Sequence, residues 1–115
     1  MIQIVKDADT RPWFFLQTAH TTYGMRVMET GHLEHLYYGE RITVDSQDPA
    51  SCAPLVIQRA FAPGNTCTYD REHPQISMED VCLEVGTLGK GDIREPFLEV
   101  RFADGSVTSD FTFDS

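Results

Sequence analysis

Hydrophobic and polar residues alternate in short runs through the first forty positions. WFFLQT at 13–18 is apolar and rich in residues that favour strands, and TYGMRVME at 22–29 alternates between two faces. A turn at Thr30 and Gly31 leads into HLEHLYYG at 32–39. Two strand-like runs joined through a glycine predict a β-hairpin.

The C-terminal third carries the clearest hairpin pattern. Apolar positions alternate with charged ones over 98–102, and a second alternating run follows at 107–113. Asp104 and Gly105 stand between the two runs, and glycine tolerates the positive φ that such turns require. This pattern predicts an antiparallel sheet with one solvent-facing side.

The middle of the chain is irregular in composition. Residues 43–75 are rich in Pro, Asp, Asn, Ser and Gly, apart from the apolar segment LVIQRAF, and are expected to form loops. SMEDVC at 77–82 is expected to form a single helical turn. The fold class that follows is all-β: an antiparallel β-sandwich with long loops and one short helical turn.

The stretch GHLEHLYYG raises the question of a metal site. His32 and His35 are three residues apart, which would place both imidazoles on one face of a helix but on opposite faces of a strand. The strand assignment therefore disfavours a shared zinc ion, and the H-E-x-x-H order is not present. We expect His35 to be partly buried and bonded to a neighbour, with no metal and no cofactor.

Length and charge narrow the class of protein. At 115 residues with a formal net charge of −9, the chain is expected to be one small acidic domain or a piece of a larger one, and its nine basic residues are dispersed. Nucleic acid and anionic membranes require a basic surface, so neither is an expected partner. The N-terminus does not have the pattern of a secretory signal, and we expect a cytoplasmic location.

Other candidate chemistry is weak in this sequence. Cys52, Cys67 and Cys82 form an odd, sparse set without C-x-x-C, as expected of reduced thiols. Asp70 and Glu72 lie beside a histidine in a loop, and glycosidases use two carboxylates, but carboxylates in a polar loop are usually solvated. Trp13 could stack on a sugar, yet a WFFL run is more often core.

A resemblance to a known family emerges from several stretches read together. They are YGMRVMETGHLEHLYYGERI, the RAFAP segment at 59–63 and YDREHPQISMEDVCLEVGTLGKGDIREPFLEVRFADGSVTSDF. In this order they resemble the start of bacterial α-galactosidases of glycoside hydrolase family 36, over about residues 15–113. The most distinctive parts are H-L-x-H-L-Y-x-G, G-K-G-D-x-R-E-P and D-G-S-x-T-S-D-F.

The resemblance implies a retaining enzyme that removes terminal α-linked galactose from melibiose- or raffinose-type sugars. In that family an N-terminal β super-sandwich precedes a catalytic (β/α)8 barrel and a C-terminal β domain, and both catalytic carboxylates are barrel aspartates. No K-W-D segment of the barrel occurs here. We therefore expect residues 1–115 to be part of the N-terminal domain, with no catalytic residue and with the barrel and C-terminal domain absent.

The resemblance also implies partners and candidate substrate-binding residues. The N-terminal domain of bacterial relatives assists tetramer formation, and one of its loops can reach a neighbouring subunit's sugar pocket. The corresponding stretch surrounds Gln58 and Arg59, where some members have an aspartate in place of Gln58. Tyr69, Arg71 and His73 are further candidates by location alone.

Two other functions remain open at this point. One is a stand-alone carbohydrate-binding β-sandwich, and the other is an unrelated scaffold or metal-dependent protein. Part of a larger sandwich should expose apolar surface meant for missing strands, so we expect the isolated chain to self-associate.

Overall fold

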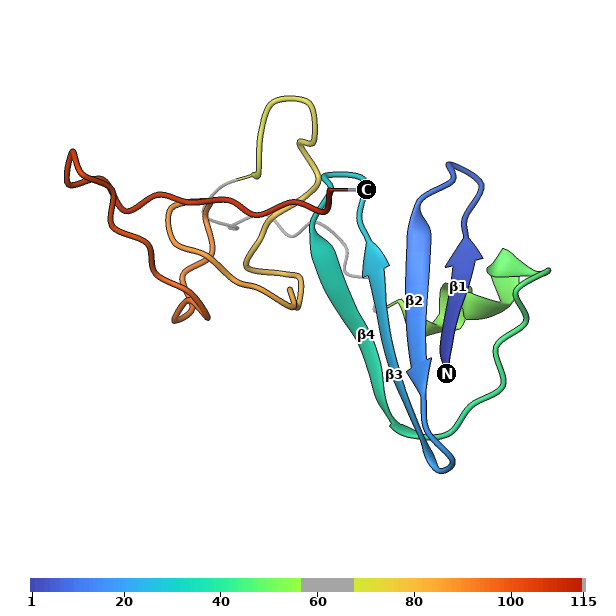
Figure 1. Cartoon of the computed structure of the whole chain (residues 1–115). Coiled ribbons are helices and arrows are strands. Elements are labelled where there is room, and N and C mark those ends of the chain that lie inside the picture. The colour runs from blue at the N-terminus through green and yellow to red at the C-terminus, as the bar shows by residue number, and fades with distance from the viewer. Residues whose placement is uncertain (57–67, 115) are drawn as a thin grey trace.

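The computed structural model describes residues 1–56 and 68–114, and its main element is a four-stranded sheet (Figure 1). The strands are β1 (Ile2–Lys6), β2 (Pro12–Gln17), β3 (Thr21–Val27) and β4 (Leu33–Glu40). All neighbours are antiparallel, in the order β1-β2-β3-β4. The all-β class is confirmed, as are the three expected strands within residues 13–39.

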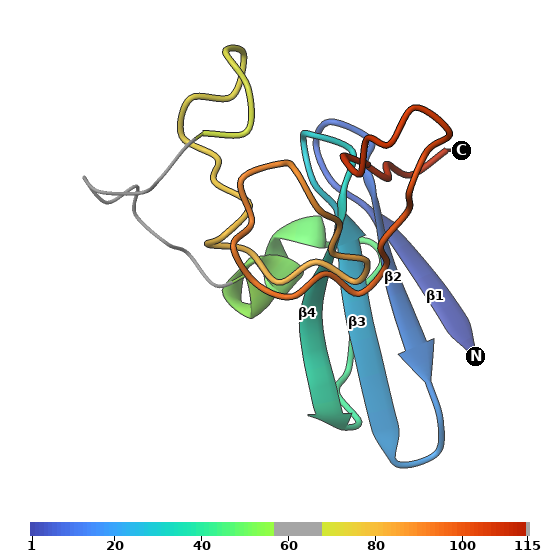
Figure 2. The same ribbon diagram turned by 90° about the vertical axis from the view of Figure 1, so that its left-hand side faces the viewer.

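One face of the sheet carries the hydrophobic core. Val5, Trp13 and Phe15 point to this face and are buried together with Cys52. Cys52 lies on η1 (Pro49–Leu55), a short 3-10 helix that starts at a proline, whose fixed φ suits a first helical turn. Figure 2 shows η1 on one side of the sheet and the C-terminal end of the chain on the other.

The opposite face of the sheet is apolar but largely uncovered. Ile2, Ile4, Leu16 and Tyr38 are between 39 % and 69 % exposed. The strand register places Ile2 beside Leu16 and Ile4 beside Phe14. Phe14 is partly covered, because its ring packs 5.6 Å from that of Phe113. We call the four exposed residues the open apolar face.

A register shift between Gly24 and Met25 interrupts the pairing of β3 with β4. Gly24 lies opposite Tyr37, whereas Met25 lies opposite His35, so β4 carries one extra residue, Leu36. Leu36 packs against the core. An extra residue of this kind defines a β-bulge and changes the alternation of faces along the strand.

The expected C-terminal hairpin is only half correct. The turn forms, with Gly105 at φ +87° and the amide of Phe102 donating to the carbonyl of Ser106. The flanking runs 98–102 and 107–113 are not strands. A two-stranded hairpin is marginal unless its apolar face is packed, and here Phe102 and Phe111 remain 47 % and 46 % exposed.

The helical turn expected at 77–82 is also wrong. Only a turn forms there, with the amide of Asp80 donating to the carbonyl of Ser77. Nη2 of Arg94 donates to the carbonyls of Met78 and Val81, and a helical turn would have used that of Met78 internally. The one short helix of the described residues is η1, within a range that was expected to be loop.

The segment after this turn joins the outer edge of β4. The amide of His35 donates to Cys82, the amide of Glu84 donates to Leu33, and Leu83 forms an isolated antiparallel bridge with Glu34. The pairing covers the beginning of β4 only.

Within the described residues, no helix is long and apolar enough to cross a membrane.

Candidate functional site

The loop that runs from Tyr69 to Ile76 holds the sequence-predicted residues that the structure describes. It projects away from the sheet (Figure 1) and is closed at its base by the amide of Tyr69, which donates to the carbonyl of Ile76 at 2.7 Å. Asp70 organises the turn, since its Oδ1 accepts from the backbone amide and from Nδ1 of His73 at 2.7 and 2.8 Å. The loop is therefore held by its own polar contacts.

The three described candidates differ in what their side chains do. Tyr69 and His73 lie close together, with ring centroids 6.2 Å apart, and each is engaged by a carboxylate of this chain. Arg71 is exposed between them. Gln58 and Arg59 lie outside the described residues.

Tyr69 belongs to a network centred on Asp110. The Tyr69 hydroxyl donates to Oδ2 of Asp110 at 2.6 Å, and Nε2 of His32 lies 2.5 Å from Oδ1. The other ring nitrogen of His32 is 2.7 Å from Oγ1 of Thr30. Lys90 completes the group at 3.8 Å from the carboxylate and over the Tyr69 ring. We call these five residues the Asp110 network.

The pKa shifts within the Asp110 network indicate that it stabilises the fold. Burial raises the pKa of Asp110, but hydrogen bonds from Tyr69 and His32 outweigh it and leave that pKa below its usual value. Donation to Asp110, with a smaller contribution from burial, raises the pKa of Tyr69 to about 12. The phenol therefore keeps its proton at neutral pH and is committed to a neighbour within the chain.

His35 has a separate set of partners. Its Nδ1 lies 3.1 Å from Oε1 of Glu84, and its ring packs 5.1 Å from that of Tyr23. The Tyr23 hydroxyl also donates to Glu84, and burial first, then this bond, raises the pKa of Tyr23 to about 12. The expectation of a partly buried, bonded His35 is confirmed, and the two histidines of GHLEHLYYG bind different carboxylates.

The thiols of the described residues are unpaired. Cys52 is buried and Cys82 is exposed. Burial raises the pKa of the Cys52 thiol, which disfavours the nucleophilic thiolate.

Trp13 is 6 % exposed, so its ring belongs to the core and is not available to stack on a sugar. The guanidinium carbon of Arg26 lies over the Trp13 ring, 5.5 Å from its centroid.

These observations define an all-β domain whose polar clusters join parts of its own chain. Residues 31–115 match the glycosyl hydrolase family 36 N-terminal domain, and the chain belongs to this family.

Similar proteins include longer enzymes of known structure. The bifunctional α-galactosidase/sucrose kinase AgaSK of Mediterraneibacter gnavus is 34 % identical over 89 % of this chain and 10 % of its own length. The α-galactosidase AgaA of Geobacillus stearothermophilus is 29 % identical over 87 % of this chain and 13 % of its own. The crystal structure of an α-galactosidase from Lactobacillus brevis superposes with a TM-score of 0.77 at 32 % identity, over 96 % of this chain and 14 % of that one. The chain therefore spans about a tenth to a seventh of these relatives.

Sequence reasoning missed the partner of His32. Asp110 lies 78 positions away, and no spacing rule connects two residues across such a distance. The strand β1 was also missed, although Ile2, Ile4 and Val5 supply β-branched side chains in a run that has the length of a strand. That signal was available from the sequence.

Proposed function

We propose that this chain is a non-catalytic part of the N-terminal β-sandwich domain of a retaining α-galactosidase that acts on melibiose- and raffinose-type oligosaccharides. Family membership and the α-galactosidase relatives support this proposal. In it, the catalytic carboxylates belong to a separate (β/α)8 barrel of the same cytoplasmic protein. Residues 1–115 pack against other parts of the enzyme and assist assembly of a homo-oligomer, a tetramer in the family.

The open apolar face is the observation that carries the packing role. Its four exposed side chains come from β1, β2 and β4, and Tyr23 of β3 lies opposite both Leu16 and Tyr38, so the apolar surface extends across the sheet. An antiparallel sheet that faces water permanently normally alternates apolar inward and polar outward. A sheet with apolar side chains on both faces is suited to burial between two layers.

The loop from Tyr69 to Ile76 supports a second role, in shaping the sugar pocket. It projects from the domain, its base is fixed by the Asp110 network, and Arg71 is exposed. A guanidinium held on a rigid loop can donate several hydrogen bonds to sugar hydroxyls. We also assign sugar contact to Gln58 and Arg59. Tyr69 and His73 contribute to the same pocket by supporting the loop.

A chimaera tests the packing role. Residues 1–115 would replace the matched segment of the L. brevis α-galactosidase, and hydrolysis of p-nitrophenyl α-galactoside and native mass would be measured. We expect an active assembly that loses both properties with Ile4→Asp and Leu16→Asp together, because carboxylates cannot be buried against apolar partners without large cost. The matched control is Ile93→Asp, an exposed apolar residue 78 % accessible and outside the sheet. Full activity and unchanged mass in the double variant would contradict the packing role.

The same chimaera tests the proposed contact of the loop with sugar, through KM for melibiose. Arg71→Ala should raise KM for melibiose and leave native mass unchanged, whereas Glu72→Ala at the neighbouring exposed position serves as the control. An unchanged KM in Arg71→Ala would remove this residue from the proposed pocket.

A further inference from the structure

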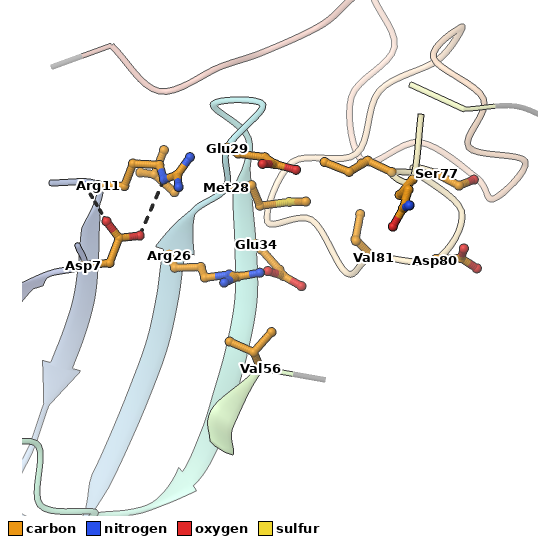
Figure 3. A pocket seen from close by; sticks show the side chains of 13 residues that line it. Asp7, Arg11, Arg26, Met28, Glu29, Glu34, Val56, Ser77, Asp80 and Val81 are labelled. Atoms are coloured by element: carbon orange, nitrogen blue, oxygen red, sulfur yellow. Dashed lines mark hydrogen bonds and ion pairs between the residues drawn. The ribbon is translucent and has the colours of Figure 1, made fainter. Parts of the chain in front are cut away.

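A groove of about 400 Å³ lies beside the core (Figure 3), and its described lining residues include no member of the Asp110 network. One wall is formed by Arg11 near the start of β2, Arg26 of β3 and Glu34 of β4. The facing wall is formed by the segment that includes Ser77 and Val81. Its volume lies within the range typical of small-molecule sites.

The sheet wall offers hydrogen-bond donors in a fixed position. Nε of Arg26 donates to Oε2 of Glu34 at 2.6 Å, and the guanidinium stacks over Trp13. Both contacts immobilise Arg26, whose side chain is only 25 % exposed. Among the described residues, the two Nη groups of Arg26 have no hydrogen-bond partner, so they are available to a ligand.

The facing wall holds a buried hydroxyl without a partner. Ser77 is 2 % exposed, and its Oγ has no hydrogen-bond partner within residues 1–56 and 68–114. Buried hydroxyl groups are almost always bonded, because leaving one unbonded costs free energy. Ser77 lines the groove, so a rotation of its side chain about χ1 would bring this hydroxyl to a ligand there and remove that cost.

The charges of the lining select the ligand class. Among the described residues that line the groove, the two guanidinium groups of Arg11 and Arg26 stand against four carboxylates, so this lining carries a net formal charge of −2. This balance disfavours phosphate and other anions. A neutral molecule with several hydroxyls suits the mixed lining, since each hydroxyl can donate to a carboxylate and accept from a guanidinium. Met28, Val56 and Val81 add apolar surface for the C–H face of a ring.

We infer that this groove, which meets the projecting loop at Gln75 and Ile76, binds a neutral saccharide of one or two rings at a site separate from the barrel. Ser77 and Arg26 fix the orientation of the saccharide, and the aliphatic side chains contact its ring. The inference goes beyond the proposed function, since the site lies wholly within residues 1–115 and needs no catalytic domain.

Titration of the ¹⁵N-labelled chain followed by NMR tests the inference. The probes are methyl α-galactoside, melibiose, raffinose, sucrose and maltose. Each is added up to about 50 mM, which exceeds the millimolar dissociation constants of weak sites. Saturable shifts are expected at the amides of Arg26, Ser77 and Val81. Ser77→Ala should weaken binding about fivefold, as one hydrogen bond is lost, and should not lower the melting temperature. No saturable shift with any of these sugars would overturn the inference, as would tighter binding of inorganic phosphate or spermidine.

Two further variants separate a local effect from a general one. Ser109→Ala removes a second serine hydroxyl that is buried without a partner among the described residues, at a position outside the groove, and should leave sugar affinity unchanged. Val81→Phe fills the groove and should abolish the shifts while the chain stays folded. Equal affinity in Ser77→Ala, Val81→Phe and the unaltered chain would show that the sugars bind elsewhere and would overturn the assignment.

Discussion

Nε2 of His32 and Oδ1 of Asp110 lie 2.5 Å apart, which joins the start of β4 to a segment 78 positions further along the chain. His32 is 2 % exposed, so the contact is shielded from water. A second long-range link is parallel to it, since the amide of Phe113 donates to the carbonyl of Gly31 at 2.8 Å. The irregular C-terminal half is thereby fixed to the end of the sheet.

Asp110→Asn should destabilise the chain by about 2 kcal/mol, because a charged acceptor shared by His32 and Tyr69 is replaced by a neutral amide. Urea unfolding followed by circular dichroism measures this difference. The control is Asp114→Asn, the same substitution at an exposed position four residues on. A loss equal to that of the control would mean that the network does not contribute to stability.

The contribution of Asp110 should depend on pH. Its pKa is lowered in the folded chain, so the carboxylate stabilises the fold fully above its unfolded pKa of about 3.9, and this stabilisation is lost as pH falls through the lower folded value. The difference in free energy of unfolding between the chain and Asp110→Asn should therefore be constant from about pH 7 to 5 and shrink below about pH 4. A difference that grows on acidification would have the wrong sign.

Gly24→Ala should destabilise the sheet by about 1–3 kcal/mol, the usual cost of overpacking. A Cβ at this position would lie 3.0 and 3.1 Å from two ring carbons of Phe15, which is itself completely buried. Gly86→Ala is the control, since the nearest atom to its Cβ would be 3.9 Å away. Thermal unfolding compares the two, and equal melting temperatures would contradict tight packing at Gly24.

The isolated chain should self-associate at tens of micromolar through the open apolar face. Sedimentation velocity should show that Ile4→Asp with Leu16→Asp restores a monomer, whereas Ile93→Asp does not. A monomeric unaltered chain would remove this face as the site of association, and dissociation by Ile93→Asp alone would move it to the C-terminal half.

The sequence predicted the sheet where alternation coincided with burial, and failed where it did not. Phe15 and Val27 are buried as strand residues should be, and the turn at Gly31 adopts positive φ. The same alternation at 98–113 produced no strands, because a periodic pattern does not show whether a packing partner is present. Arg94 donates to backbone carbonyls where a helical turn was expected, and His32 is linked to Asp110. Both depend on contacts between residues distant in sequence, which local patterns do not encode.

Among the candidate site residues, prediction by location did not reveal their contacts. Tyr69 and His73 were chosen as residues of a loop, and the structure shows both bonded to carboxylates of the same chain. The groove residue Ser77 carried no sequence signal, because its importance rests on a hydroxyl that is buried without a partner. Such an atom can be recognised only once its surroundings are known.

The core has a consequence for the order of folding. Among the described residues, the cluster around Phe15, including Cys52 and Val56, lies within the first 56 positions, and each strand pairs with its neighbour in sequence. Contacts between residues close in sequence form quickly because little loop entropy is lost. At about 5–20 residues per second, synthesis takes several seconds to advance from β4 to Asp110. The sheet and its helix can thus assemble on the ribosome first, and the C-terminal half then docks onto a preformed surface.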